Sequence, residues 1–399
     1  MGFLSTALQR KSTNTLDLFR EIYGSRLSKS GEAVSWKTAL QVSTVLACAR
    51  VIAEGISQVP LKLYQEDGKQ RLPAKSHPLY KLLHRKPNPW QTSFEYREML
   101  ALHLVLCGRH YSFINRIGSR ILELMPFEPQ CVETKVASDG TLSYVVTING
   151  RAQVFPAESI WHIKGPSWNG YEGMEAVQLA REAIGLALAT ESQHATLHAN
   201  GISTNGVYSV EGTLNPEQYK QLRKFIVENH SGENRGVPMI LDRNAKWLSQ
   251  ALSGVDAEHL DTRRFQVEEI CRALRVMPIM VGHADKTATY ASAEQMFLAH
   301  VVHTLSPWYE RIEQSIDVNL LDPKDYDAGI YSKFVEEGLL RGAMSDTADY
   351  LTKLVQYGIL TRNECRGRID ENPLDGLDEP LTPVNLAAGI KPELAPAGA

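Results

Sequence analysis

The chain has 399 residues, of which 43% are hydrophobic and 22% are charged, a composition typical of globular proteins and a length that fits two or three structural units. Its 42 Lys and Arg residues are outnumbered by 46 Asp and Glu residues, which gives a formal net charge of −4. Proteins that hold nucleic acid tightly by its phosphates usually carry a basic excess, so tight nonspecific DNA binding by the whole surface is not expected.

Cysteine usage and apolar runs bear on the compartment. The cysteines are widely spaced and include no Cys-x-x-Cys pair, which argues against a disulfide framework or structural zinc site and fits a reducing cytosol. They are Cys48, Cys107, Cys131, Cys271 and Cys365. The first ten residues lack the apolar core of a signal peptide. The run Met99–Cys107 is about half of the ~20 residues that a membrane helix needs, so we expect a soluble protein with no membrane partner.

The first quarter of the chain is mostly helical in pattern. Residues 1–35 are polar and weakly patterned, and we expect them to form an N-terminal arm or a loosely held leader. Val59-Pro60 ends the helical pattern that follows. The pattern predicts a helix from Ser35, a strand at 61–64 and a helix at 77–83. A further helix is expected to be capped by Ser93 and to end at Gly108.

Residues 110–164 change period and favour strands. Gly118-Ser119, Asp139-Gly140 and Asn149-Gly150 are tight-turn pairs, each set between β-prone segments. We therefore expect one small antiparallel sheet here, and residues 36–165 together are typical of a single α+β unit.

Two long helices are expected to bracket a compact insert. Residues 173–199 carry a stripe of mostly small residues at helical spacing, which allows helices to approach closely. Residues 203–250 follow, with strand-like segments at 207–210 and 238–241 on either side of a short helix that begins at Asn215-Pro216. A second long helix is expected from Asp256 to Pro278.

A polar loop then leads into the longest helical pattern, 293–320, which Ser292 with Gln295 begins as a capping box. An unbroken helix of this length would span ~42 Å at 1.5 Å per residue. Pro307 interrupts it, because a proline inside a helix removes a hydrogen bond at a cost of ~3 kcal/mol. Ser306 can cap the second half with Pro307 at its first position, so we expect a kink at these two residues.

The C-terminal part is expected to hold a helical pair, 346–357 and 362–369. The second helix begins at a capping box formed by Thr361 with Glu364. After Pro373 the chain is rich in Pro, Ala and Gly and carries an acidic run, which is typical of a disordered tail.

The common catalytic motifs are missing from the sequence. Residues 282–287 lack the second glycine of a phosphate-binding loop, and residues 165–170 have the wrong spacing for a nucleophile elbow. His194 and His198 have the spacing of a zinc pair without the accompanying glutamate, so two ordinary helix histidines are favoured. The helical pair within 346–369 permits a helix-turn-helix that reads DNA, although an ordinary helical hairpin is favoured. We therefore expect no catalytic residue, cofactor or metal site.

Four segments carry a resemblance to a known family. Residues 39–64 read ALQVSTVLACARVIAEGISQVPLKLY, residues 77–116 read HPLYKLLHRKPNPWQTSFEYREMLALHLVLCGRHYSFINR, residues 270–317 read ICRALRVMPIMVGHADKTATYASAEQMFLAHVVHTLSPWYERIEQSID, and residues 360–366 read LTRNECR. In this order they resemble the compact portal (connector) proteins of long-tailed double-stranded-DNA bacteriophages, over roughly residues 36–373. Local departures are Val276-Met277-Pro278, where the family often has Val-Pro-Pro, and Gly108-Arg109, where it often has Gly-Asn.

The resemblance implies a portal fold of the α+β class, with a wing, a two-helix stem, a clip, a long kinked tunnel helix and a helical crown. The implied divisions are an N-terminal arm (1–35), the wing (36–170), stem helix 1 (171–202), the clip (203–252), stem helix 2 (253–276), the tunnel loop and kinked helix (277–327), a return segment with the crown (328–373) and a disordered tail (374–399).

The resemblance also implies a function and partners. The chain would be a structural, non-enzymatic subunit of a twelve-fold ring at one capsid vertex, through which DNA is packaged and ejected. Its partners would be double-stranded DNA bound without sequence specificity, the terminase large subunit, the major capsid protein, the scaffold and the head–tail adaptor, with no cofactor. We expect it in the virion, after assembly in the host bacterial cytoplasm. Another ring-forming head–tail protein is the alternative, and a nucleic-acid enzyme is a third that the missing motifs disfavour.

Two sets of candidate functional residues follow from the resemblance. The clip is expected to dock the motor and adaptor through Glu228, Glu233 and Arg235. The tunnel loop is expected to line the narrowest part of the channel and contact DNA through Gly282, His283, Ala284, Asp285, Lys286, Thr287 and Ala288. Lys286 would meet phosphates, and Asp285 beside it would limit the attraction so that DNA can slide.

Overall fold

The chain, described here from a computed structural model, divides into two compact units. Unit 1 comprises residues 1–48 and 175–283, and unit 2 comprises residues 49–174 and 284–399. The residues that the structure describes are 27–67, 70–200, 206–209, 215–221, 224, 246–249, 255–283, 290–336, 341–369 and 371–381. Both units contain helices and strands, so the predicted α+β class is confirmed.

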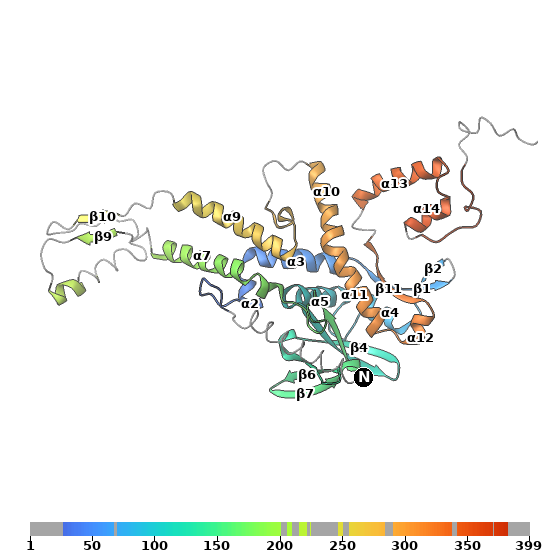
Figure 1. The fold of residues 1–399 in the computed structure, drawn as a ribbon, viewed down its shortest axis with the longest axis horizontal. Helices are drawn as coiled ribbons and strands as arrows, with labels where there is room; N and C mark the ends of the chain where they lie inside the picture. Colours follow the sequence, from blue (N-terminus) through green and yellow to red (C-terminus); the bar gives the residue numbers. More distant parts are fainter. Residues whose placement is uncertain are drawn as a thin grey trace, which may run out of the picture. The chain divides into compact units, whose positions relative to one another are not determined.

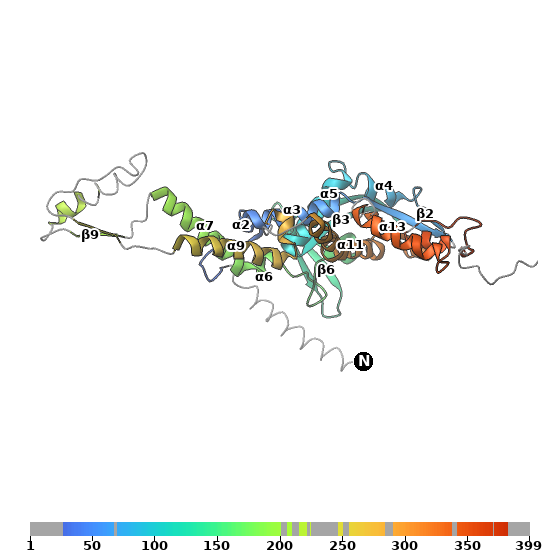
Figure 2. The ribbon, with the colours of Figure 1, turned by 90° about the horizontal axis from the view of Figure 1, so that it is seen from above.

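Two long helices form much of unit 1. Helix α7 (Arg181–Asn200) and helix α9 (Val255–Leu274) run side by side in both ribbon views (Figures 1 and 2). Between them, the Gln266 side-chain amide donates a hydrogen bond to Thr190 Oγ1 at 3.4 Å. The prediction of a second long helix beginning near Asp256 is confirmed.

Shorter elements complete the described part of unit 1. They are α2 (Trp36–Ala39), the first residues of α3 (Ser43–Ser57), α6 (Ala176–Leu179), the paired strands β9 (Gly206–Ser209) and β10 (Lys246–Ser249), and a 3-10 turn at Pro278–Val281. The predicted helix at 173–199 is interrupted at Ala180, where φ is −90° and ψ is 11°. The predicted helix from Ser35 is likewise divided between α2 and α3.

Part of the predicted N-terminal arm is packed on unit 1. The Lys29 N–H donates to Glu182 Oε2 at 3.0 Å, and Gln178 Nε2 donates to the Val34 carbonyl at 2.9 Å. Val34 is fully buried. The prediction of a loosely held arm is therefore wrong for residues 27–35, and residues 1–26 lie outside the described residues.

Small antiparallel sheets form the strand-rich part of unit 2. Their strand orders are β11-β1-β2, β4-β3-β8 and β5-β6-β7. The strands are β1 (Leu61–Asp67), β2 (Gln70–Pro73), β3 (Arg109–Ile117), β4 (Arg120–Phe127), β5 (Val132–Val136), β6 (Leu142–Ile148), β7 (Arg151–Pro156), β8 (Ile160–Lys164) and β11 (Ile330–Phe334).

The single sheet predicted over 110–164 is in fact two sheets. A 3-10 turn at Pro129–Cys131 ends the pairing of β4 before β5 begins, and β8 returns to pair with β3. The predicted turns are confirmed, since Gly118 and Gly140 have φ of 61° and 86°. Asn149-Gly150, with φ of 49° and 75°, has the two left-handed residues that suit a tight hairpin turn.

The helices of unit 2 are α4 (Pro78–His84), α5 (Ser93–Cys107), α10 (Tyr290–His300), α11 (Ser306–Asn319), α12 (Pro323–Asp327), α13 (Arg341–Gln356) and α14 (Arg362–Arg368), with the second part of α3. Thr92, and not Ser93, caps α5, because its hydroxyl accepts the Glu95 N–H while Ser93 donates to the Leu83 carbonyl. The capping box predicted at Ser292 is also wrong, because α10 already begins at Tyr290.

The C-terminal helical pair is confirmed, together with its capping box at Thr361 and Glu364. The disordered tail is wrong for residues 374–381, because the buried Asn363 side chain binds them. Asn363 Nδ2 donates to the Leu374 carbonyl at 2.8 Å and to Asp378 Oδ1 at 3.0 Å, and its Oδ1 accepts the Leu374 N–H at 2.9 Å. Residues 382–399 lie outside the described residues.

Candidate functional site

A π-helical segment, Val301–Leu305, joins α10 to α11 at the predicted kink. The Ser306 N–H donates to the Val301 carbonyl, five residues back. Pro307 has no N–H and so cannot donate the hydrogen bond of a regular helix. The wider π-helical turn falls where that hydrogen bond is missing. The predicted cap at Ser306 is wrong, because this residue keeps helical dihedrals (φ −55°, ψ −38°) and its hydroxyl instead donates to Glu336 Oε2 at 3.4 Å.

Helix α11 is seated on α3 and on strand β8. The Tyr309 hydroxyl donates to the Gly55 carbonyl at 2.8 Å. The Leu305 side chain fills the space beside Gly55 that a Cβ atom there would need. Trp161 Nε1 donates to Ser315 Oγ at 3.0 Å from β8. These contacts hold α11, the second part of the predicted kinked helix, in place.

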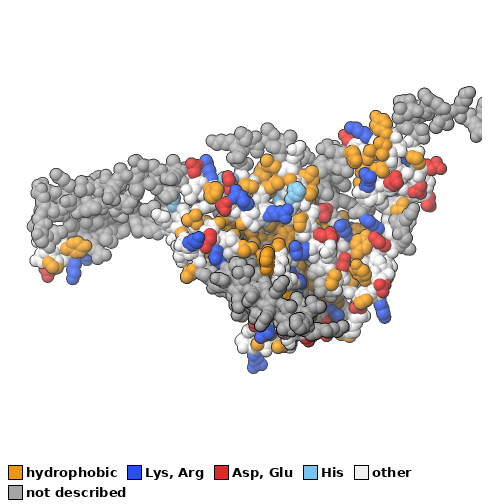
Figure 3. Space-filling view, viewed as in Figure 1, with side chains coloured by type: hydrophobic (Ala, Val, Ile, Leu, Met, Phe, Trp, Pro, Cys, Tyr) orange, Lys and Arg blue, Asp and Glu red, His pale blue; other side chains and the backbone are white. Residues whose placement is uncertain are grey.

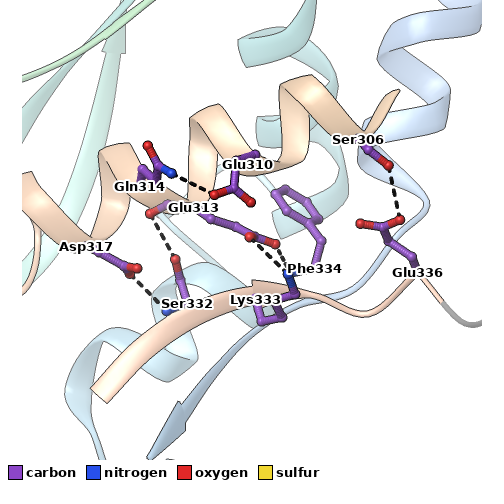
Figure 4. Close-up of polar contacts among 9 residues, drawn as sticks. All are labelled: Ser306, Glu310, Glu313, Gln314, Asp317, Ser332, Lys333, Phe334 and Glu336. Atoms are coloured by element: carbon purple, nitrogen blue, oxygen red, sulfur yellow. Dashed lines mark hydrogen bonds and ion pairs between the residues drawn. The ribbon is translucent and has the colours of Figure 1, made fainter. Parts of the chain in front are cut away.

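Carboxylates of α11 bind the free edge of β11 (Figure 4). Glu313 Oε1 accepts the Phe334 N–H at 2.6 Å, and Asp317 Oδ1 accepts the Ser332 N–H at 2.9 Å. The Ser332 hydroxyl donates to the Glu313 carbonyl at 3.1 Å. Since β11 pairs with β1 along its other edge, these acids satisfy N–H groups that an edge strand would leave open.

Burial raises the pKa of Glu313, Asp317 and Glu336 above the ordinary carboxyl range, because desolvation disfavours the charged form. A backbone N–H and Lys333, whose Nζ lies 3.5 Å from Glu313 Oε2, oppose that shift at Glu313. Glu313 and Asp317 line a cleft of about 380 Å³, together with Glu66, Arg71 and Glu310. Among the described residues, these three acids contact groups of unit 2, so the cluster holds α11 to β11 and to the residues that follow it.

Three histidines that the sequence analysis did not predict lie in or near the core of unit 2. His110 in β3 and His162 in β8 are buried, and His103 in α5 is half-buried. His103 Nδ1 and His110 Nδ1 share a hydrogen bond at 3.1 Å, and His110 Nε2 and Ser112 Oγ share one at 3.0 Å. His162 Nδ1 lies 3.1 Å from the Tyr144 hydroxyl. Burial lowers the pKa of His103 to about 4, that of His162 to about 3, and that of His110 well below its usual value. No local spacing signals these groups, because they come from three separate elements.

Only the start of the predicted tunnel loop is described. Gly282 ends the 3-10 turn after α9 with φ of 78°, a left-handed conformation that favours glycine. The His283 N–H donates to the Pro278 carbonyl at 3.0 Å, and His283 Nε2 lies 3.9 Å from Glu268 Oε1. The other predicted loop residues, Ala284, Asp285, Lys286, Thr287 and Ala288, lie outside the described residues.

The predicted clip is described only in part. Strand β9 matches the strand expected at 207–210, and it pairs with β10, which was not predicted. The second expected strand, 238–241, lies outside the described residues. The docking residues Glu228, Glu233 and Arg235 lie outside the described residues. Their role therefore stays a prediction.

The described residues contain no cluster of three or more His, Cys, Asp or Glu side chains that could hold a metal ion. None of the helices in the described ranges is long and apolar enough to cross a membrane.

Comparison of the sequence with known proteins points to phage portal proteins in each case. A profile of the phage portal protein family matches residues 43–370. The portal protein of Enterobacteria phage HK97 is 28% identical over 85% of this chain and 81% of its own length. The probable portal protein of Streptomyces phage phiC31 is 30% identical over 98% of this chain and 91% of its own length.

Solved structures show the same fold. A chain from the neck of an empty gene transfer agent particle, computed with C6 symmetry, is 25% identical with a TM-score of 0.63, over 85% of this chain and 93% of its own. A chain from the neck of the native particle, computed with C12 symmetry, is 24% identical with a TM-score of 0.62, over 85% and 92%. An HK97-family phage portal protein from Corynebacterium diphtheriae is 16% identical with a TM-score of 0.56, over 76% and 95%.

The fold is shared with a chain from the neck of a gene transfer agent particle and with an HK97-family portal protein. The family match and the phage relatives define the protein more narrowly. The chain belongs to the phage portal protein family, and it is a structural portal ring subunit of the virion, not an enzyme.

Proposed function

We propose that twelve copies of this chain form a ring at one capsid vertex, and that DNA passes through its channel during packaging and ejection. The carrying observation is the family match over 43–370, together with the likeness to a particle neck computed with C12 symmetry. In this proposal α7 and α9 form the stem, residues 203–252 the clip, and α13 with α14 the crown. Residues 36–170 and 277–327 form the wing, and the capsid protein and scaffold are further partners of the ring.

Exposed apolar side chains near α13 support assembly into a ring. Tyr350, Tyr357 and Ile359 are 57%, 62% and 66% exposed. Figure 3 shows hydrophobic side chains over this C-terminal helical pair. Apolar groups that gather on a surface mark protein contacts, so we expect neighbouring crowns to cover them.

Imaging of the purified full-length chain tests the ring. We expect rings with an axial hole and a mass of twelve times 44.5 kDa, or about 530 kDa, by light scattering after gel filtration. A stable monomer at high concentration would contradict the proposal. ATPase and nuclease activities of the same sample should stay at background.

We further propose that the clip binds the terminase large subunit and the head–tail adaptor. The motivation is their position, since Glu228, Glu233 and Arg235 are charged residues in the insert between the two stem helices and charged groups can steer a partner. Reversing these three charges should weaken capture of terminase and adaptor by assembled rings. The matched control is Glu133→Lys, at an exposed position of β5. Unchanged binding by the clip variant, or by a variant lacking 212–236, would refute this assignment.

A further inference from the structure

Two cysteines that are far apart in the sequence have neighbouring sulfur atoms within unit 1. Cys48 lies in α3 and Cys271 in α9, 223 positions later, and their Sγ atoms are 3.7 Å apart. Both residues are fully buried and neither is in a disulfide. A disulfide requires ~2.05 Å between sulfurs, so closing this pair needs an approach of about 1.7 Å.

The two thiols are unequal. The sulfur–sulfur hydrogen bond lowers the pKa of the Cys271 thiol and raises that of the Cys48 thiol. The Glu268 carboxylate opposes the change at Cys271. Because the thiolate is the reactive form of cysteine, Cys271 is the better nucleophile of the pair and Cys48 is placed to react second.

We propose that Cys48 and Cys271 are a redox pair, reduced while the chain is made and closed to a disulfide in the released particle. The timing of this reaction rests on the proposed function, since a virion subunit passes from a reducing cytosol to an oxidising exterior. The cysteine spacing in the sequence argues against a framework of several disulfides. It says nothing about a single disulfide between two cysteines that the fold brings together.

A peroxide is the oxidant that suits a fully buried pair, because hydrogen peroxide is small. The Cys271 thiolate attacks one peroxide oxygen and breaks the O–O bond, which gives a sulfenic acid and hydroxide. The Cys48 sulfur then attacks the Cys271 sulfur and displaces the sulfenic oxygen, and the Cys48 proton leaves with it in water. Overall, two thiols and one hydrogen peroxide give one disulfide and two waters.

The bridge would tie α9 to α3 over a long stretch of chain. Cross-links that close long loops restrict the unfolded chain most. Helix α9 leads directly into the turn at Pro278–Val281 and on to Gly282. The oxidised form would therefore hold the entry to the predicted tunnel loop against α3, whereas the reduced form leaves α9 free of that covalent tie.

The first test uses the purified full-length chain with no substitution. The reduced protein is treated with a few equivalents of hydrogen peroxide, then denatured, alkylated with N-ethylmaleimide and digested for mass spectrometry. We expect a cross-linked peptide pair containing Cys48 and Cys271, and three alkylated cysteines where the reduced protein has five. The melting temperature should rise by roughly 5 °C on oxidation and return with dithiothreitol.

Variants separate the bridge from other oxidation. Cys271→Ala should abolish both the cross-link and the oxidation-dependent rise in melting temperature. Cys107→Ala, at another buried cysteine, is the matched control and should keep both. If wild-type Cys48 and Cys271 stay alkylatable, or if Cys271 stops at sulfinic acid without a cross-link, the proposal is overturned.

Particles provide the second test. The cross-link should be present in released virions and absent from infected cells quenched with acid before lysis. A cross-link in the purified chain but not in released virions would overturn the timing. If the chain forms no rings and yet forms the bridge with peroxide, the proposed function fails while the chemistry of the pair stands, so the two failures are distinguishable.

Discussion

The carbonyl oxygen of Gly108 occupies the space that a Cβ atom on Gly173 would need. Gly108 ends α5 in a left-handed conformation, with φ of 69°. The same carbonyl accepts the Gly165 N–H at 2.7 Å. The turn formed by residues 165–174 therefore closes against the end of α5 through backbone atoms, which have no rotamer with which to move aside.

Gly173→Ala should therefore lower the free energy of unfolding by about 2 kcal/mol or more, because the backbone must shift to admit the methyl group. Thermal unfolding of the purified variant gives the measurement. The matched control is Gly170→Ala in the same turn, where φ is 79° and no atom lies within 4 Å of the added carbon. That variant should lose only ~1 kcal/mol from its left-handed backbone. Equal losses in the two variants would contradict the prediction.

Glu313→Gln should leave unit 2 as stable as the wild type at pH 7, or stabilise it by up to ~1 kcal/mol. Burial raises the pKa of Glu313, so the charged form is costlier in the folded than in the unfolded chain. A glutamine oxygen can still accept the Phe334 N–H. Glu313→Ala removes the acceptor and should cost ~1–3 kcal/mol, because a buried N–H is left unpaired. Urea denaturation distinguishes the two variants, and a loss in Glu313→Gln equal to that in Glu313→Ala would contradict the argument.

Elements set by local chemistry could be predicted from the sequence. The Asn149-Gly150 turn and the Thr361–Glu364 capping box depend on residues within a few positions of each other, and both are confirmed. The family could also be inferred, because four short segments in the right order carry more information than any composition.

Features that depend on distant pairing could not be predicted. Strand β11 forms only because Leu61 pairs opposite Phe334, and no short-range signal marks a partner so far along the chain. Asp317 and Glu313 accept backbone N–H groups of that strand, which lie 15 and 21 positions further along the chain. Cys48 and Cys271, like the buried histidines, are scattered in sequence and meet only in the fold.

Stability should fall as the pH drops below about 6.5. The pKa of His103 is lowered to about 4 and that of His162 to about 3, and the pKa of His110 is also lowered. Between pH 6.5 and the lowered pKa of each histidine, the unfolded chain binds a proton that the folded chain does not bind. Each histidine therefore lowers the free energy of unfolding by up to ~1.4 kcal/mol for each pH unit. Below the folded pKa the loss stops. The raised carboxyl pKa values act in the opposite direction, since the folded acids bind protons before the unfolded ones.

Urea denaturation between pH 7.5 and 5 measures this slope. His162→Gln should make the slope of unfolding free energy against pH shallower by the contribution of one histidine. This change in slope does not depend on the stability of the variant at pH 7. His303→Gln, at an exposed position of the π-helical segment, should leave the slope unchanged. A slope that is the same in wild type and His162→Gln would show that His162 does not take up a proton on unfolding.

Truncation of the C-terminus should have two distinct outcomes. Ending the chain after Leu381 keeps every contact that Asn363 makes, so the melting temperature should not change. Ending it after Asn372 removes the Leu374 and Asp378 partners of the buried Asn363 side chain, which should loosen α14 at a cost of ~1–3 kcal/mol. Rings should form in both cases. Limited proteolysis between α13 and α14 provides the measurement, and equal cleavage rates would contradict the expected difference.

Removing His283–Thr287 should leave ring assembly intact while impairing the passage or retention of DNA. Helix α9 before this segment and helix α11 further along are held by contacts that the deletion spares, Gln266 to Thr190 and Tyr309 to Gly55. His283, the described member of the segment, lies outside the buried core. In a ring of twelve, Lys286 would recur around the axis, and its attraction for phosphates acts over only ~8 Å at physiological salt.

The opposed charges of Asp285 and Lys286 give the matched pair of substitutions. Asp285→Asn leaves Lys286 unopposed, so DNA should be held more tightly and packaging should slow most at low salt, because phosphate contacts strengthen as salt falls. Lys286→Ala should lack that salt dependence. Packaging in a portal-deficient phage complemented with each variant, scored by the length and retention of encapsidated DNA, measures both effects. Wild-type packaging and retention by the His283–Thr287 deletion would show that this loop does not contact DNA, even if every variant still forms rings.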